Sequence, residues 1–302
     1  MSQPECKWGI DLGGTKIEGA IMDSSQPGRV LHRLRRDTEA VGGYHHILSQ
    51  IEGLLCDLES ATGLDRPAQI GIGTPGAIEP STGMLKNSNT TCLNDRPFLE
   101  DLKRLTGCGI LMANDANCFA LAEAVLGAAA GADVVFGIIL GTGVGGGIVI
   151  HRRVLAGLHG IAGEWGHNPL RGESHPCYCG RSGCIEGVLA GPSLERFYRE
   201  QGGEAIRLPE ICRRAHAGDD LAKQTLDLLR RKFAEAIGAV INILDPDAIV
   251  IGGGVGNIPL LYEEETRAEI LGHIFNKELR AQILKPTLGD SAGVFGAALL
   301  VD

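Results

Sequence analysis

The amino-acid sequence predicts a duplicated α/β protein with two lobes, and three observations support this fold class. Residues 8–21, WGIDLGGTKIEGAI, and residues 136–150, FGIILGTGVGGGIVI, look like two versions of one unit in which a glycine turn joins two strands. Strand-like and helix-like patterns alternate after each unit, which is typical of α/β folds. The chain has 302 residues, which is long enough for two lobes of ordinary domain size.

The first lobe is expected to follow the order β-β-β-α-β-α-β-α. Its first two strands are predicted at residues 7–13 and 16–22, because apolar residues there flank a turn rich in glycine. Residues 44–61 carry isoleucine and leucine at helical spacing and predict an amphipathic helix. The other predicted elements are strands at 30–34, 70–74 and 110–113, helices at 97–105 and 114–130, and a long polar loop at 77–96.

The second lobe begins where the pattern restarts, with a strand, a glycine turn and a returning strand predicted within residues 134–154. Its later elements are predicted to be helices at 192–201, 209–217, 221–244 and 260–281, a strand at 248–251, a short strand before Gly289, and an apolar helix at 292–301. We therefore expect a small lobe of residues 1–115 with the C-terminal helix 291–302, and a large lobe of residues 116–290.

The composition is that of an ordinary globular protein, with 44% hydrophobic and 22% charged residues. The net charge of −9 argues against a nucleic-acid-binding surface. No apolar run reaches the ~18 residues of a membrane span, and the N-terminus lacks the basic and apolar regions of a signal peptide. Six of the nine cysteines are scattered, as expected in a reducing compartment. We expect a cytoplasmic protein that binds neither nucleic acid nor membranes.

Residues 163–186, GEWGHNPLRGESHPCYCGRSGCIE, gather potential metal ligands in a segment rich in glycine. Three cysteines in a C-x-C-x4-C array follow one histidine: His167, Cys177, Cys179 and Cys184. Three thiolates and one imidazole complete a tetrahedral zinc shell without an open position, so the predicted zinc is structural. The alternative is that reduced cysteines pack as small hydrophobic side chains. Glu164 and Glu186 flank the ligands, so zinc would hold them in one wall of a binding site for a polar small molecule.

Three glycine turns stand at the ends of predicted strands, and the first contains Gly13, Gly14, Thr15 and Lys16. Its glycines let backbone N–H groups approach an anion closely, and the threonine and lysine add donors. Asp11, at the end of the preceding strand, suits a Mg²⁺ ion held directly or through water. This turn is predicted to bind the phosphates of a nucleotide.

The other two turns extend the same prediction. Residues 140–147, with Gly141, Thr142 and Gly143, superficially match a dinucleotide fingerprint, but a strand rather than a helix follows, which argues against NAD. The phosphate-loop pattern of Walker-type NTPases is absent from the sequence. Gly253 and Gly254 in the third turn leave bare backbone against which a base or ribose can lie. Each turn taken alone is also compatible with a purely structural hairpin.

The motifs together resemble a known family. DLGGTK, ANDANCFALAEA, LGTGVGGG, GEWGHNPL with CYCGRSGC, and INILDPDAIVIGGG are similar to motifs of the ROK family of bacterial sugar kinases and repressors, and the resemblance runs over residues 8–300. Within the family the pattern looks most like fructokinase/mannokinase-type members and N-acetylglucosamine kinases. The resemblance implies an actin/hexokinase-like fold of two ribonuclease H-like lobes with a cleft between them. It also implies ATP with Mg²⁺ as donor, a hexose as acceptor, a structural zinc and a homodimer.

The resemblance also implies roles for individual residues. Asp115 matches the catalytic base, and Asn114 beside it matches a sugar-binding amide. Glu164 and Glu186 match carboxylates that bind sugar hydroxyls, and His167 matches a zinc ligand at the edge of the sugar site. Turns one and two match the phosphate loops, and the third matches the adenosine side.

Simpler roles remain open for several of these residues. Asp115 also suits a helix N-cap, and the two glutamates could be ordinary solvated acids. Asn89, after the turn at Gly76, is a further candidate for sugar binding, although its segment could be a simple polar loop.

The resemblance leads us to expect phosphorylation of a hexose at its 6-hydroxyl, with Asp115 as general base. Residues 86–98 and 165–170 look closer to fructokinase/mannokinase-type members, so fructose is the first expectation, with mannose and glucose as further substrates. N-acetylglucosamine or N-acetylmannosamine is the alternative. A sugar-responsive repressor would need an N-terminal helix-turn-helix, for which the first strand at residue 7 leaves no room. A non-catalytic sugar-sensing protein is the remaining alternative from another functional class.

Overall fold

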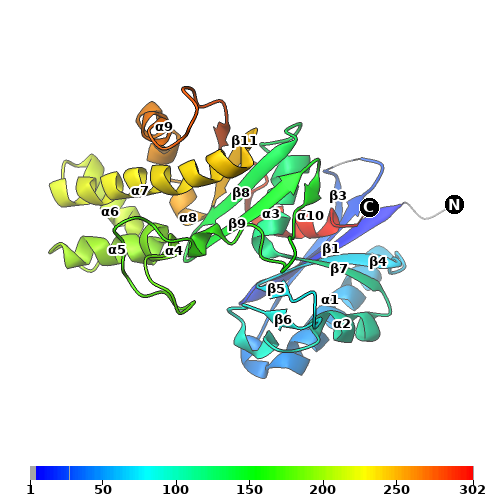
Figure 1. Ribbon diagram of the computed structural model, residues 1–302. Coiled ribbons are helices and arrows are strands. Elements are labelled where there is room, and N and C mark those ends of the chain that lie inside the picture. The colour runs from blue at the N-terminus through cyan, green and yellow to red at the C-terminus, as the bar shows by residue number, and fades with distance from the viewer. Residues whose placement is uncertain (1–4, 27, 302) are drawn as a thin grey trace. The chain divides into compact units, whose positions relative to one another are not determined.

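The computed structural model describes residues 5–26 and 28–301 (Figure 1). Its contacts divide the chain into two compact units. Unit 1 consists of the chain up to Gly131, Gly147–Ala162, and the C-terminal segment from Thr287, whereas unit 2 consists of Ala132–Gly146 and Gly163–Pro286. Unit 1 thus includes residues 116–131 and 147–162 as well as the C-terminal segment, whereas the predicted small lobe consists of residues 1–115 and 291–302.

A five-stranded mixed sheet forms the centre of unit 1. Its strands are β1 (Cys6–Leu12), β2 (Lys16–Asp23), β3 (Val30–Asp37), β4 (Gln69–Thr74) and β7 (Gly109–Asn114). The strand order is β3-β2-β1-β4-β7, with β2 antiparallel to both β1 and β3, and β4 parallel to both β1 and β7. The first three strands form a meander because short turns connect them, whereas each parallel connection contains a helix.

Helices α1 (Tyr44–Thr62) and α2 (Phe98–Thr106) belong to the core on one face of this sheet. The apolar residues of α1 recur at helical spacing and are buried: Tyr44, Ile47, Leu48, Ile51, Leu54, Leu55 and Leu58. Gly19 of β2 allows them to approach, because a Cβ atom there would lie 2.8 Å from Leu58 Cδ1. This confirms the helix predicted from the isoleucine and leucine pattern.

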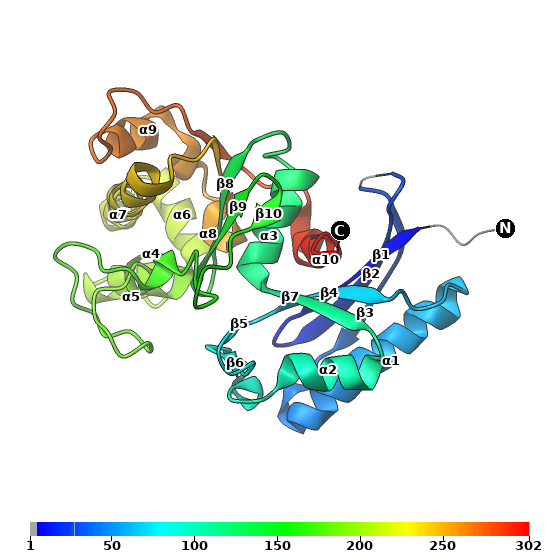
Figure 2. The ribbon, with the colours of Figure 1, turned by 45° about the vertical axis from the view of Figure 1, so that its right-hand side comes forward.

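Helices α3 (Asp115–Val125) and α10 (Ala292–Ala298) pack together over the other face (Figure 2). Glycines make this packing possible, because a Cβ atom on Gly71 would lie 1.7 Å from the carbonyl oxygen of Ala297. A Cβ atom on Gly9 would likewise lie 2.4 Å from the carbonyl oxygen of Val294. The C-terminal helix is therefore part of unit 1 through direct backbone contact with the first sheet.

A buried carboxylate adds a second link between the C-terminal segment and α3. Glu123 has no exposed surface, and it accepts hydrogen bonds from the backbone N–H groups of Thr287 (3.1 Å), Leu288 (3.0 Å) and Ala128 (2.8 Å). Backbone donors thus compensate for its burial. The turn that brings Ala128 back to Glu123 also explains why α3 ends at Val125, earlier than predicted.

The second five-stranded sheet has the strand order β10-β9-β8-β11-β12, which repeats the order of the first sheet. Its strands are β8 (Val134–Leu140), β9 (Val144–Ile150), β10 (Arg153–Val154), β11 (Ala248–Gly252) and β12 (Gln282–Leu284). The helices that follow are α4 (Glu186–Leu189), α5 (Gly191–Glu200), α6 (Leu208–His216), α7 (Asp220–Leu244), α8 (Gly253–Gly256) and α9 (Glu264–Leu271). The internal repeat predicted from sequence is therefore a repeat of topology.

Three further elements differ from their predicted extents. Strand β9 begins inside the predicted glycine turn, because its glycines adopt extended backbone. Helix α9 ends at Leu271, ten residues early, where Gly272 follows and the loop returns so that His273 packs against Gly238 of α7. The predicted polar loop contains a small hairpin of β5 (Ala77–Ile78) and β6 (Leu85–Lys86).

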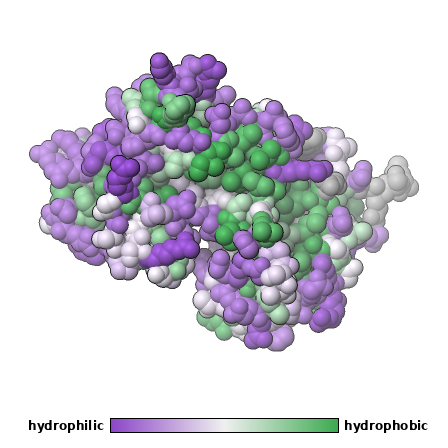
Figure 3. All heavy atoms as spheres, in the orientation of Figure 1, coloured by the Kyte–Doolittle hydropathy of each residue, from purple (hydrophilic) through white to green (hydrophobic). Residues whose placement is uncertain are grey.

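The surface is mainly hydrophilic in the view of Figure 3, with smaller hydrophobic areas between polar residues. Single exposed apolar side chains occur in both units, among them Leu158 (84% exposed) and Phe275 (98% exposed). Among the described residues, none of the helices combines the length and the hydrophobicity that crossing a bilayer requires.

Candidate functional site

Asp11 lies at the end of β1, on the sheet face covered by α3 and α10. Two glycines leave room for its carboxylate: a Cβ atom on Gly293 would lie 2.4 Å from Oδ2, and one on Gly73 would lie 3.3 Å from Oδ1. Within residues 5–26 and 28–301, no hydrogen bond or ion pair is formed by this carboxylate. Burial, followed by the negative charges of Asp115 and Glu18, raises its pKa to about 7. An unpaired carboxylate with excess negative charge around it suits a divalent cation.

Asn114, not Asp115, is the N-cap of α3. The side-chain Oδ1 of Asn114 accepts the backbone N–H of Asn117 at 3.1 Å. Asp115 is the first helical residue and accepts the adjacent N–H of Ala116 at 2.8 Å. Its side chain retains solvent-accessible surface, while desolvation by the surrounding protein raises the pKa of the carboxyl. The capping role considered for Asp115 therefore belongs to its neighbour, which leaves Asp115 available for chemistry.

The first glycine turn joins β1 to β2 and is held by its own backbone. The N–H of Gly13 donates to the carbonyl of Lys16 at 2.9 Å, and Gly14, Thr15 and Lys16 are exposed. Thr38, a buried residue just after β3, donates its hydroxyl to the carbonyl of Gly13 at 2.7 Å and its N–H to the carbonyl of Thr15 at 2.8 Å. Thr38 was not predicted from the sequence, because its contact with the turn arises only when β3 pairs with β2.

Asn89 lies in an ordered, exposed position after the β5–β6 hairpin. Its neighbour Ser88 is buried and forms two hydrogen bonds with Asn94: the Ser88 N–H donates to Oδ1 at 2.8 Å, and Nδ2 donates to the Ser88 carbonyl at 2.9 Å. Gly76 has a φ angle of 87° and lies against β6, where a Cβ atom would be 2.4 Å from the carbonyl of Lys86. The loop is thus fixed by side-chain hydrogen bonds rather than being an unstructured polar segment.

In unit 2 the second and third glycine turns meet at one edge of the second sheet. Strands β8 and β11 are parallel, with Ile139 opposite Gly252, so Gly141–Gly143 and Gly253–Gly254 follow neighbouring strand ends. Gly253, with φ of 83°, packs so closely on Leu140 that a Cβ atom would lie 2.2 Å from its carbonyl oxygen. Thr142, Gly253 and Gly254 are exposed. Strand β9 follows the second turn, which confirms the argument against a dinucleotide fingerprint.

Glu186 links the cysteine segment to the second glycine turn. Its Oε2 accepts the backbone N–H of Val144 at 2.9 Å. Gly143 allows this approach, since a Cβ atom there would lie 2.7 Å from the same oxygen. The sequence placed Glu186 near zinc ligands, and the structure adds a contact with a predicted phosphate loop.

The four predicted metal ligands come together in unit 2. One ligand atom from each of His167, Cys177, Cys179 and Cys184 lies within 4.8 Å of the others. The Sγ of Cys177 is 3.6 Å from His167 Nδ1, and the Sγ atoms of Cys179 and Cys184 are also 3.6 Å apart. Zinc bonds of about 2.3 Å to sulfur and 2.0–2.1 Å to nitrogen give tetrahedral edges of roughly 3.5–3.8 Å, so the donor set fits zinc.

Two side chains surround the other ring nitrogen of His167. Its Nε2 lies 4.0 Å from an oxygen of Glu164 and 3.2 Å from the hydroxyl of Tyr178. Tyr178 is 81% exposed, but partial desolvation, and then the charge of Glu186, raises the pKa of its hydroxyl to about 12. Glu164 is thus next to the metal-ligand group, as the sequence predicted. Tyr178 was not predicted, although its position between two ligand cysteines was a signal for it.

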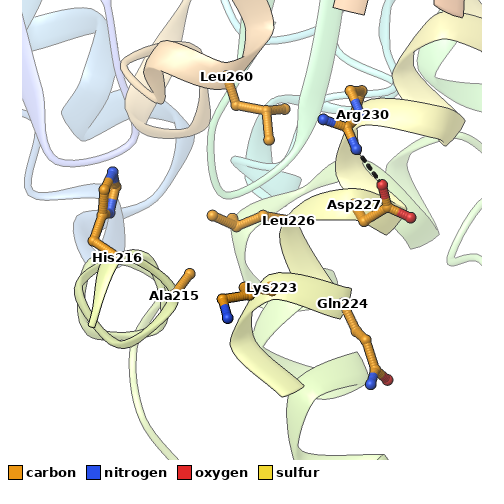
Figure 4. A pocket seen from close by; sticks show the side chains of 8 residues that line it. All are labelled: Ala215, His216, Lys223, Gln224, Leu226, Asp227, Arg230 and Leu260. Atoms are coloured by element: carbon orange, nitrogen blue, oxygen red, sulfur yellow. Dashed lines mark hydrogen bonds and ion pairs between the residues drawn. The ribbon is translucent and has the colours of Figure 1, made fainter. Parts of the chain in front are cut away.

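A separate pocket of about 480 Å³ opens between α6, α7 and the residues after α8 (Figure 4). Its lining residues are Ala215, His216, Lys223, Gln224, Leu226, Asp227, Arg230 and Leu260. Two cations in it already have partners: Arg230 donates to Asp227 (Figure 4), and Lys223 donates to the carbonyl of Gly218 at 2.9 Å. None of the residues predicted for the site lines this pocket.

The sequence model of the ROK family matches residues 7–302. The chain belongs to the ROK family. It is 35% identical over 305 residues to an N-acetyl-D-glucosamine kinase of Pasteurella multocida, a match that covers 97% of this ROK chain and 98% of the relative.

Solved structures agree with this assignment. A ROK hexokinase from Thermus thermophilus matches with a TM-score of 0.83 and 32% identity, over 98% of this chain and 97% of that one. A ROK family glucokinase from Streptomyces griseus, solved with glucose and AMPPNP, matches with a TM-score of 0.75 and 27% identity, over 97% and 98% of the two chains. The ROK chain therefore has the actin/hexokinase-like fold predicted from its sequence.

Proposed function

We propose that this ROK protein is an ATP-dependent sugar kinase, with N-acetylglucosamine as the favoured acceptor and Asp115 as general base. The observation that carries the proposal is the division of roles at the start of α3. Asn114 caps the helix, and Asp115 keeps an accessible carboxylate whose pKa is raised by desolvation. A carboxylate with a raised pKa is a stronger base, which suits proton transfer from a sugar hydroxyl.

Phosphoryl transfer requires mainly positioning and charge stabilisation. Asp115 would accept the proton of the attacking hydroxyl as the new O–P bond forms. Asn114 uses its Oδ1 in capping, so its Nδ2 donor is the group it can offer to the sugar. In unit 2, Glu164 and Glu186 would accept hydrogen bonds from sugar hydroxyls, and Asn89 of unit 1 would add an amide.

The three glycine turns would hold the nucleotide. The turns Gly13–Lys16 and Gly141–Gly143, in which Gly14, Thr15, Lys16 and Thr142 are exposed, would bind the phosphates, and the exposed Gly253 and Gly254 would lie against the adenosine. Asp11 would hold Mg²⁺, because its carboxylate forms no hydrogen bond or ion pair with other described residues. When bound, Mg²⁺ would neutralise part of the charge on the phosphates.

We propose that the cluster of His167, Cys177, Cys179 and Cys184 binds a structural zinc ion. The four ligand atoms lie within 4.8 Å of one another, two of their separations are 3.6 Å, and the segment between them is short and rich in glycine. Its role would be to hold Glu164 and Glu186, one through His167 and the other through the chain that follows Cys184. No step of phosphoryl transfer needs this ion.

The identity of the sugar depends on the comparisons more than on motif similarity. The loop sequences favoured fructose, whereas relatives with 32–35% identity over nearly the whole chain are N-acetyl-D-glucosamine kinases. We therefore place N-acetylglucosamine first and keep fructose as the competing substrate. Turnover of N-acetylglucosamine, N-acetylmannosamine, fructose, mannose and glucose in a coupled ADP assay decides between them. A higher kcat/KM for fructose than for N-acetylglucosamine would overturn the choice of sugar and leave the kinase proposal standing.

Absence of sugar-dependent ADP release with all five sugars would instead favour a non-catalytic sugar sensor. The unpaired Asp11 and accessible Asp115 support catalysis over that alternative. The homodimer and the cytoplasmic location remain predictions from the sequence, and light scattering of the purified protein tests the first of them.

A further inference from the structure

Three charged residues form a row across the first sheet. Glu18 of β2 stands directly opposite Asp11 of β1, and Arg35 of β3 stands opposite Glu18. Residues that face each other on adjacent strands project from the same face of a sheet. Arg35, Glu18 and Asp11 therefore form one line, the charged row, on the face that α3 and α10 cover.

Glu18 is the centre of this row and is almost completely buried, with 7% exposure. Its Oε2 accepts the Nε–H of Arg35 at 2.7 Å, and its Oε1 accepts the hydroxyl of Ser291 at 2.9 Å. Arg33 lies 3.5 Å from Oε1 and also donates to the Ser291 hydroxyl. These charge-assisted hydrogen bonds hold the buried carboxylate in one position.

Ser291 connects the row to Asp11 by a second route. It immediately precedes α10, and two residues later the backbone of Gly293 lies against the Asp11 carboxylate, where a Cβ atom would be 2.4 Å from Oδ2. The hydrogen bond from Ser291 to Glu18 thus holds the segment that contacts Asp11. Glu18 acts on Asp11 both through its charge and through this contact.

We infer that Glu18 and Arg35 are positioning residues that control how tightly the Asp11 site holds the divalent cation of the nucleotide. The inference rests on the proposed function, in which Asp11 binds Mg²⁺. A neighbouring carboxylate favours a cation, whereas a guanidinium opposes it. The other charged or ionisable groups around Asp11 are Asp115 and Cys118 of α3, and Asp290, before α10, faces Arg35.

The two residues should act in opposite directions and with unequal strength. Adjacent strands are about 4.8 Å apart, so Glu18 stands one strand from Asp11 and Arg35 stands two strands away. Arg35 is also partly exposed, with 41% of its side chain accessible, and is screened by solvent. We expect Glu18→Gln to weaken cation binding by about tenfold and Arg35→Gln to strengthen it by about threefold.

The experiment measures Mn²⁺ binding to the full-length protein with a non-hydrolysable ATP analogue, using the electron paramagnetic resonance signal of free Mn²⁺. Glu52→Gln is the matched control, because Glu52 of α1 also pairs with an arginine, Arg66 (2.9 Å), on the opposite face of the sheet. Thermal unfolding is measured in parallel for each variant. Ser291→Ala removes the contact between Glu18 and the 291–293 segment and should weaken binding with both charges still present.

Opposite shifts for Glu18→Gln and Arg35→Gln, with Glu52→Gln at the wild-type value, are the expected result. Shifts of both variants in the same direction, or shifts no larger than that of the control, would overturn the inference. If Glu18→Gln does not fold, Arg35→Gln and Ser291→Ala decide the question by the same criteria. Asp11→Asn distinguishes failure of the proposed cation site from failure of the role inferred for Glu18 and Arg35. If it leaves Mn²⁺ binding unchanged, the proposed cation site is wrong. If it abolishes binding while the charged-row variants have no effect, only the inference fails.

Discussion

Replacement of Asp115 by asparagine tests the proposed chemistry with little change of structure. Asparagine retains an Oδ1 that can accept the N–H of Ala116, which Asp115 accepts at 2.8 Å, and the N-cap is a different residue, Asn114. The favourable interaction of a carboxylate with the helix N-terminus, about 0.3–1 kcal/mol, is lost. Removal of a carboxylate whose ionisation is disfavoured by desolvation acts in the opposite direction. We therefore expect an unfolding temperature close to that of the wild type.

The effect on turnover should be much larger. General-base assistance is typically worth about 10²–10⁴-fold, which corresponds to roughly 3–5 kcal/mol in the activation free energy. We expect kcat to fall by at least this factor, while the Kd of an ATP analogue stays unchanged, because Asp115 acts on the attacking hydroxyl. A coupled ADP assay measures the rate, and calorimetric titration measures nucleotide binding.

The chain supplies a matched control at the start of α7. Asp220 is also the first helical residue after a capping residue, Asp219, whose side chain accepts the N–H of Ala222 at 2.9 Å, but its own side chain is 89% exposed. Asp220→Asn should leave turnover unchanged. Near-wild-type turnover of Asp115→Asn would refute the assignment, and so would a loss of activity explained by a lower unfolding temperature.

Three further predictions concern Asp11, the second glycine turn and the cysteine cluster. Folding raises the pKa of Asp11 to about 7, so the stabilising contribution of its protonated form is complete below about pH 4 and is lost as the pH rises through 7. Asp11→Asn should therefore raise the free energy of unfolding in urea by about 1–4 kcal/mol at pH 8, with no such gain at pH 4. Gly143→Ala places a methyl group 2.7 Å from Oε2 of Glu186 and should raise the KM for sugar. A Cβ atom on Gly141 meets nothing within 4 Å, so Gly141→Ala should leave that KM unchanged. Cys184→Ser should lower the bound zinc measured by mass spectrometry from about one equivalent to near zero and lower the unfolding temperature, whereas substitution of the exposed Cys56 should change neither.

Much of the fold was accessible from sequence because its signals are local. The strand–turn–strand repeat, the apolar spacing of α1 and the C-x-C-x4-C array each lie within about twenty residues. Errors occurred where a specific contact of the following turn or loop, rather than a change in the apolar pattern, ended an element. Helix α3 stops at Val125 because the following turn returns to Glu123, and α9 stops at Leu271 because the next loop packs on α7.

The candidate site shows the same difference between local sequence motifs and contacts that form only on folding. The sequence singled out Asp11, the glycine turns and the four candidate metal ligands, since each belongs to a compact motif. It could not assign the N-cap of α3 to Asn114 rather than Asp115, because both residue types favour that position and only the hydrogen bond to Asn117 distinguishes them. It also could not identify Thr38 as a support of the first turn, because strand pairing creates that contact.

By itself, the sequence determined the fold class, the duplicated strand–turn–strand unit and the residue types gathered at the ends of the strands, because short-range periodicity and motif spacing encode them. Only the tertiary structure decided which of these residues are neighbours. The Glu18–Ser291 hydrogen bond joins residues 273 positions apart, and Glu186 reaches Val144 across 42 positions. Such contacts depend on the strand register and on close backbone packing at glycines such as Gly71 and Gly293, which leave no periodic pattern in the sequence.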